Sequence, residues 1–117
     1  MAKLRFYYGT MGGAKSLRLL TTAYNFQEKN LNFIVLKPAC DTRDGNDVIS
    51  SRIGLKRPCL ALYPQDSVHL IVENYKNLNN NQLNWLLLDE AQFLTEKQVD
   101  ELANIVDTLN VDVMCFG

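Results

Sequence analysis

The sequence is poor in features that mark several classes of protein. Its three cysteines, Cys40, Cys59 and Cys115, are odd in number, far apart and without a C-x-x-C pair. This pattern argues against a disulfide framework and against a zinc site in the chain, and it predicts that the cysteines serve as small apolar residues. No repeat, low-complexity stretch or linker interrupts the sequence, so residues 1–117 are expected to form one domain.

Long apolar runs and an excess of basic charge are also missing. No apolar run approaches the ~20 residues that span a bilayer, and the N-terminus lacks the basic and apolar regions of a secretion signal. The formal net charge is −1, and lysine and arginine form no cluster of the kind that binds nucleic acid or membrane surfaces. These absences predict a cytoplasmic protein with small-molecule partners.

Short apolar runs alternate with segments of helical periodicity. The apolar runs predict buried strands at residues 4–8, 32–37, 84–88 and 111–117, and the periodicity predicts helices at 15–30, 66–78 and 95–110. Residues 48–63 contain two short strand-like pieces separated by GLKRP, which predict a hairpin outside the main sheet. Strands that alternate with helices indicate an α/β fold, with a parallel sheet and flanking helices.

Helical spacing also predicts which side chains face the core. The first helix should bury Leu17, Leu20 and Tyr24. The second should begin at an Asp66 or Ser67 cap and bury Val68, Ile71, Val72 and Tyr75. The third should begin with a capping box formed by Thr95 and Gln98, and bury Val99, Leu102, Ala103, Val106 and Leu109.

The segment YYGTMGGAKS contains a modified phosphate-loop motif. Gly9, Lys15 and Ser16 fit G-x-x-x-x-G-K-[ST], but Ala14 stands where the second glycine belongs. Such a loop binds phosphate through backbone N–H groups and the positive end of the helix dipole, while the lysine contacts the β- and γ-phosphates and the serine binds Mg²⁺. A positive φ at Ala14 would cost ~1–2 kcal/mol and a helical φ little. We expect Gly12 and Gly13 to adopt most of the backbone angles that the turn requires. The alternative for the whole segment is a glycine-rich turn with a purely structural role.

The segment LLLDEAQF places two acids at the end of a hydrophobic strand. Parallel sheets bind ligands at the carboxyl ends of their strands, so Asp89 is expected on the Mg²⁺ side of a nucleotide site. Alternation along the strand predicts that Glu90 points to the other face, where it could accept a proton from a hydroxyl or from water. The alternative is an acid pair that caps a helix at the surface.

A third segment, KPACDTRDG, follows another predicted strand. Asp41 could reach the water shell of a metal at the same edge, and Arg43 could pair with two oxygens of a phosphoryl group. A salt-bridged loop is the alternative for this segment.

Together, the segments GTMGGAKS, FIVLKPACDTR, SSRIGL and LLLDEAQF resemble the cellular-type (type II) thymidine kinases over essentially the whole chain. That family combines a phosphate loop with F-K-P-x-x-D-T-R and then D-E-x-Q-F. The resemblance implies a phosphate-loop, RecA-like nucleoside kinase core that transfers the γ-phosphoryl group of ATP to the 5′-hydroxyl of thymidine. It also implies Mg²⁺ as cofactor and assembly into homo-oligomers, namely tetramers.

The resemblance implies a role for each matching residue. Glu90 would be the general base, with Lys15 and Arg43 at the transferring phosphoryl group. Ser16, Asp41 and Asp89 would serve Mg²⁺, and Met11 and Phe93 would line the thymine pocket, although Phe93 fits a core position equally well. The residues expected to bind ATP are Gly9, Thr10, Met11, Gly12, Gly13, Ala14, Lys15, Ser16, Asp89, Glu90, Ala91 and Gln92.

The chain departs from the family pattern in three ways. Ala14 replaces the loop glycine, and Gly12 stands where the family usually has phenylalanine. The family's zinc ribbon and the loop that closes over thymidine have no counterpart, so zinc is expected only in that absent region. We therefore expect the natural chain to continue beyond Gly117 and the 117-residue chain alone to be inactive. A nucleotide-binding module with impaired catalysis and an ATP hydrolase are the alternatives.

Overall fold

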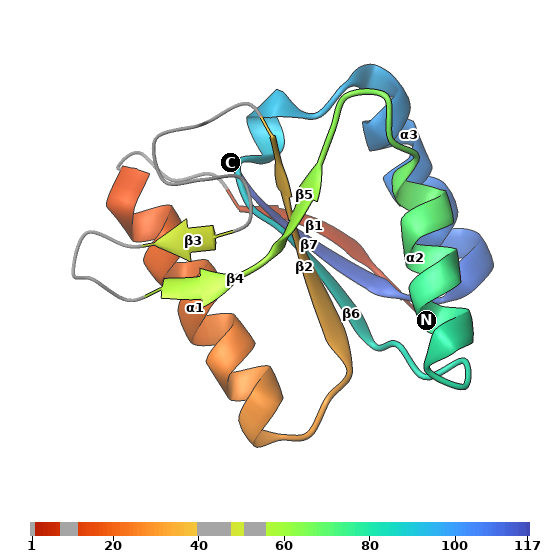
Figure 1. Cartoon of the computed structure of the whole chain (residues 1–117), viewed down its shortest axis with the longest axis horizontal. Coiled ribbons are helices and arrows are strands. Elements are labelled where there is room, and N and C mark those ends of the chain that lie inside the picture. The colour runs from red at the N-terminus through yellow and green to blue at the C-terminus, as the bar shows by residue number, and fades with distance from the viewer. Residues whose placement is uncertain (1, 8–11, 40–47, 51–55) are drawn as a thin grey trace.

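Strands and helices alternate along the chain, as the sequence predicts (Figure 1). The computed structural model describes residues 2–7, 12–39, 48–50 and 56–117. Its elements are β1 (Leu4–Tyr7), α1 (Gly12–Glu28), β2 (Phe33–Pro38), β3 (Val48–Ser50), β4 (Lys56–Pro58), β5 (Leu60–Leu62), α2 (Val68–Leu78), β6 (Trp85–Leu88), the 3₁₀ helix η1 (Ala91–Phe93), α3 (Glu96–Asn104), the π-helical turn η2 (Ile105–Leu109) and β7 (Asp112–Phe116).

The main sheet has five parallel strands in the order β1-β7-β6-β2-β5, which confirms the predicted α/β class. Since β7 separates β1 from β6, the strand before the phosphate-loop motif and the strand that carries the acid pair are not neighbours. The prediction that the first strand is buried is wrong. Within the described residues β1 lies at the edge of the sheet, and the Phe6 side chain is 38% exposed.

Helix α1 covers one face of the sheet and α2 and α3 cover the other (Figure 1). The α1 side chains that reach the core are Leu19, Leu20 and Ala23, which pack with Leu87. The predicted face was therefore wrong at Tyr24, which is 61% exposed. Runs of adjacent apolar residues satisfy more than one helical phase, and packing against the sheet decides between them.

The third predicted helix forms with its capping box but with a partly different buried face. The Thr95 side chain accepts a hydrogen bond from Gln98 N, and the Gln98 side chain accepts one from Thr95 N. Gln98, Leu102 and Ile105 are buried, and Val106 and Leu109 pack against the same core. The predicted face is therefore confirmed at Leu102, Val106 and Leu109 and wrong at the exposed Val99 and Ala103. Gln98 can lie inside because its Nε2 donates to two carbonyl oxygens of the β5–α2 connection.

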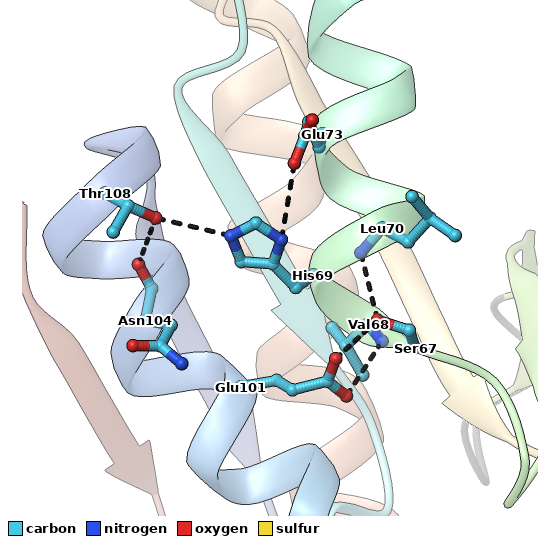
Figure 2. Close-up of polar contacts among 8 residues, drawn as sticks. All are labelled: Ser67, Val68, His69, Leu70, Glu73, Glu101, Asn104 and Thr108. Carbon is cyan, nitrogen blue, oxygen red and sulfur yellow. Dashed lines mark hydrogen bonds and ion pairs between the residues drawn. The ribbon is translucent and has the colours of Figure 1, made fainter.

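Polar contacts hold the start of α2 against α3 (Figure 2). Ser67 caps α2 by accepting a hydrogen bond from Leu70 N at 3.2 Å, and its hydroxyl donates to Glu101 on α3. Two residues after Ser67, His69 Nε2 lies 3.3 Å from the Thr108 hydroxyl oxygen on η2. These contacts confirm the predicted serine cap and hold α2 beside α3 and η2.

Strands β3 and β4 form an antiparallel pair outside the main sheet, so a hairpin is present in the predicted region but with a different second strand. Two details differ from the prediction. The GLKRP segment, expected to be a connector, contains β4 itself, and the residues after it form β5, which pairs with β2 in the main sheet. Residues that the sequence assigned to the hairpin therefore form a strand of the main sheet, where they pair with β2.

Two cysteines behave as apolar residues. Cys59 and Cys115 are buried, and burial raises the pKa of the Cys115 thiol to about 12. Cys40 lies outside the described residues. Among the helices formed by the described part of the chain, none combines the length and apolar character needed to cross a membrane.

Candidate functional site

The parallel strands bring their carboxyl ends to one edge of the sheet. Gly117 N, directly after β7, donates a hydrogen bond to Tyr7 O at the end of β1, at 2.9 Å. The Tyr7 ring stacks on Phe116, with 5.5 Å between ring centroids, and carries the Arg18 guanidinium of α1 on its ring, 4.2 Å from the centroid. These contacts hold the end of β1 against both β7 and α1. The strand and the helix that the loop motif connects are therefore fixed relative to each other.

The phosphate-loop motif leads directly into α1. Gly9, Thr10 and Met11 lie outside the described residues. The helix begins at Gly12, three residues before the predicted start at Lys15, so Gly12 and Gly13 belong to its first turn and do not provide the expected turn before it. Ala14 is also helical, and since helical residues have φ of about −63°, it avoids the strain of a positive φ.

An α-helix begins with four backbone N–H groups that have no partner within the helix. In the described part of α1 these groups come from the motif itself, Gly12, Gly13 and Ala14, and they occur at the positive end of the helix dipole. The backbone of the motif is therefore suited to an anion such as phosphate. The roles of the Lys15 and Ser16 side chains stay predictions.

Asp89 is the first residue after β6 and is nearly fully buried, with 2% of its surface exposed. Its backbone N–H donates to Leu36 O at 3.0 Å and extends the ladder between β6 and β2. Leu87 packs in the α1-side core, whereas Leu88 packs in the α2/α3-side core. By strand alternation, Asp89 belongs to the α1 side, the side on which the phosphate-loop helix lies.

Asp89 fits the predicted magnesium site in chemistry and in position. Carboxylate oxygens are ligands that Mg²⁺ prefers, and one or two of them commonly suffice when the nucleotide phosphates supply the rest. Among the residues that the structure describes, no group of three or more His, Cys, Asp or Glu side chains could hold a metal by itself. The other two predicted ligands are Asp41, outside the described residues, and Ser16, whose side chain the structure does not describe.

Glu90 adopts a left-handed backbone conformation, with φ 51° and ψ 45°. The expectation that it points to the opposite face relied on strand alternation, but β6 ends at Leu88 and the turn at Glu90 breaks the alternation. Its Oε2 accepts a hydrogen bond from Gln92 Nε2 at 2.6 Å, which ties the carboxylate to η1. A carboxylate can accept several hydrogen bonds, so this contact does not prevent Glu90 from receiving a substrate proton.

Glu90 differs from the other residues with this conformation. The remaining non-glycine residues for which a positive φ is recorded are Asn30, Asn80, Asn81 and Asn110. Asparagine tolerates the left-handed region, whereas other residues pay on the order of 1 kcal/mol or more. Strain of this kind is often found at functional sites, where the required residue type overrides the backbone preference.

Replacing Glu90 by asparagine should therefore stabilise the fold. We expect Glu90→Asn to raise the free energy of unfolding by roughly 0.5–1 kcal/mol, because asparagine tolerates the left-handed angles. Urea unfolding of the two proteins measures the change. The matched control is Asn80→Glu, at an exposed position with φ 56°, which should lose stability by a similar amount. A Glu90→Asn variant no more stable than the parent would contradict the strain interpretation.

The 3₁₀ helix η1 crosses the end of β7. A Cβ atom built on Gly117 would lie 3.2 Å from Gln92 Oε1 and 3.6 Å from Ala91 Cβ, so the two segments are in close contact. Figure 1 shows the C-terminus beside η1. Phe93 at the end of η1 is 52% exposed, so the core alternative for this aromatic is wrong. Its place in a thymine pocket stays a prediction.

Lys37, which lies near the end of β2 and is only 4% exposed, was not among the predicted site residues. The available signal was a lysine within the apolar run FIVLKP. Arg43 cannot be compared with its prediction, because it lies outside the described residues. The described part of the site thus joins the first turn of α1, the Asp89 and Glu90 pair, η1 and the buried Lys37 at one edge of the sheet.

Comparison with known proteins adds independent information. The model of the thymidine kinase family matches residues 2–117. The chain is 44% identical over all 117 residues to a thymidine kinase of Mannheimia succiniciproducens, and 42% identical to one of Pasteurella multocida. A thymidine kinase of Rhodopirellula baltica is 40% identical over the same length. The chain spans 59%, 60% and 54% of the length of these three relatives.

Proposed function

Because the chain belongs to the thymidine kinase family, we propose that the intact protein transfers the γ-phosphoryl group of ATP to the 5′-hydroxyl of thymidine. The observation that carries this proposal is the arrangement at the carboxyl edge of the sheet. A buried acid and a strained acid follow β6, on the edge where the phosphate-loop motif joins β1 to α1. Phosphoryl transfer needs both: the phosphate-loop motif would bind the phosphates, and the two acids would bind the metal and accept the proton.

In this proposal the backbone of residues 9–16 holds the ATP phosphates, with Lys15 beside the β- and γ-phosphates. Ser16, Asp41 and Asp89 are the residues that would hold Mg²⁺, either directly or through water. When bound, the ion would neutralise charge on the phosphate oxygens. Arg43 would pair with oxygens of the transferring group, since a guanidinium can bind two oxygens at once.

Glu90 would accept the proton of the thymidine 5′-hydroxyl as the oxygen attacks phosphorus. The hydrogen bond from Gln92 would orient its carboxylate, and η1 would carry Ala91, Gln92 and Phe93 along the nucleotide. Met11 and the exposed Phe93 ring would contact the thymine base, where an aromatic ring can stack. Most of the rate enhancement would then come from positioning and charge stabilisation.

Two further properties belong to the same proposal. By family resemblance, the intact protein would act in the cytoplasm and assemble into a homo-oligomer, a tetramer. Zinc would be bound only by parts of the intact protein outside this chain.

The proposal is tested by measuring ADP and free phosphate produced by the intact protein, with and without thymidine. A kinase should form ADP only when thymidine is present and release no matching free phosphate. Equal phosphate release in both samples would identify an ATP hydrolase, in which Glu90 orients water. Nucleotide binding without either product would identify a module with impaired catalysis, and both results would contradict the proposal.

A further inference from the structure

Three polar or charged side chains are buried among the described residues, Lys37, Asp89 and Gln98. The position of Gln98 is accounted for by its capping box and by its bonds to carbonyl oxygens on the α2/α3 side. Lys37 and Asp89 are of opposite charge, and they are 4% and 2% exposed. Burying a single charge costs several kcal/mol, so buried charges of opposite sign are generally found together.

Strand register brings Lys37 and Asp89 to neighbouring positions. Leu36 of β2 is paired with Leu88 of β6, so the residues that follow them lie side by side at the ends of adjacent strands. Neighbouring strands are about 4.8 Å apart. Val35 packs in the same α1-side core as Leu87, so alternation assigns Lys37 to the α1 side together with Asp89.

The backbone that carries Lys37 is held firmly. Pro38 follows it, and a residue before proline is restricted to extended conformations. On the other side of β2, Lys37 and Pro38 are in register with residues of β5, and Ala39 N donates to Leu62 O at 2.8 Å. A lysine on a strand fixed on both sides can hold a neighbouring group in one orientation.

We propose that Lys37 is a positioning residue that orients the Asp89 carboxylate toward the metal and phosphates bound at this edge. This inference rests on the proposed function. In this inference Lys37 acts through Asp89, its neighbour at the end of the adjacent strand. Groups that orient a metal ligand typically contribute a factor of about 10–100 in metal affinity or activity.

The test compares Lys37→Met, which removes the charge and keeps most of the side-chain length, with Lys37→Arg, which keeps the charge. In the intact protein, binding of a non-hydrolysable ATP analogue is titrated by calorimetry at increasing Mg²⁺ concentration. Lys37→Met should raise the Mg²⁺ concentration for half-maximal binding by about 10-fold or more, and Lys37→Arg should recover part of the loss. The matched control, Lys76→Met, removes an ammonium that donates to Leu109 O on the α2/α3 side and should leave the Mg²⁺ dependence unchanged.

Folding and mechanism are separated by the double variant Lys37→Met with Asp89→Asn, which removes both buried charges. If Lys37 acts through Asp89, adding Lys37→Met to the Asp89→Asn protein should change the Mg²⁺ dependence by less than about 2-fold. Equal effects of Lys37→Met in both backgrounds, or a folded Lys37→Met protein with the parent's Mg²⁺ dependence, would overturn the inference. Failure of the proposed function is a different result, since the parent protein itself would then form no thymidine-dependent ADP.

Discussion

Replacing Glu90 by glutamine should reduce turnover of the intact protein by about 10²–10⁴-fold and leave ATP affinity nearly unchanged. Glutamine has the same shape and can keep a hydrogen bond with Gln92, but its amide cannot take the proton of the attacking hydroxyl. The unfavourable backbone conformation of Glu90 is also retained, so stability should change little. Thymidine-dependent ADP formation measures the turnover, and calorimetry measures ATP binding.

The matched control for this experiment is Glu96→Gln. Glu96 is an exposed acid in the first turn of α3, close to Glu90 in sequence but outside η1 and its contacts. The control variant should keep parental turnover. If Glu90→Gln lost ATP affinity as strongly as turnover, Glu90 would be a metal ligand or a structural residue, and its role as base would be refuted.

Replacing Asp89 by asparagine should change the Mg²⁺ dependence of activity. Asparagine is similar in shape but neutral, and Mg²⁺ is bound far more weakly by an amide than by a carboxylate. We expect Asp89→Asn to raise the Mg²⁺ concentration needed for half-maximal activity by about 10–100-fold and to lower turnover at limiting Mg²⁺ by a similar factor. Activity measured over a range of Mg²⁺ concentrations at saturating ATP and thymidine tests this.

The comparison variant is Asp112→Asn. Asp112 begins β7 at the opposite end of the sheet, where its Oδ1 accepts a hydrogen bond from Lys3 N at 2.8 Å. Its loss should cost some stability without altering the Mg²⁺ dependence. Parental magnesium dependence in Asp89→Asn would remove Asp89 from the proposed metal site.

The elements of this fold could be predicted because local signals in the sequence are strong. Four apolar residues before the acid pair predicted β6, and the Thr95 and Gln98 capping box predicted the start of α3. Strands alternating with helices predicted the parallel sheet, and the position of acids after a strand predicted the functional edge. Each of these signals depends on residues close together in the chain.

The buried faces of α1 and α3 could not be predicted as well. Gln98 and Val99 are adjacent, and hydrophobicity favours burying the valine. The structure buries the glutamine because two carbonyl oxygens from a segment more than thirty residues away accept its hydrogen bonds. Tyr24 likewise fits the predicted apolar face of α1 but is exposed, because the helix turns the neighbouring Ala23 and Phe26 toward the sheet instead.

By itself, the sequence determined the fold class and the order of the elements outside residues 48–63, because periodicity, caps and motifs are local. Only the tertiary structure decided that β7 lies between β1 and β6, that Glu90 takes a left-handed turn, and that Lys37 lies beside Asp89. Strand order and register depend on contacts between residues far apart in the chain. The strain at Glu90 follows from those contacts, so no local pattern predicts it. The burial of Lys37 has one local signal, its position within an apolar run, but the neighbouring acid comes from a distant part of the chain.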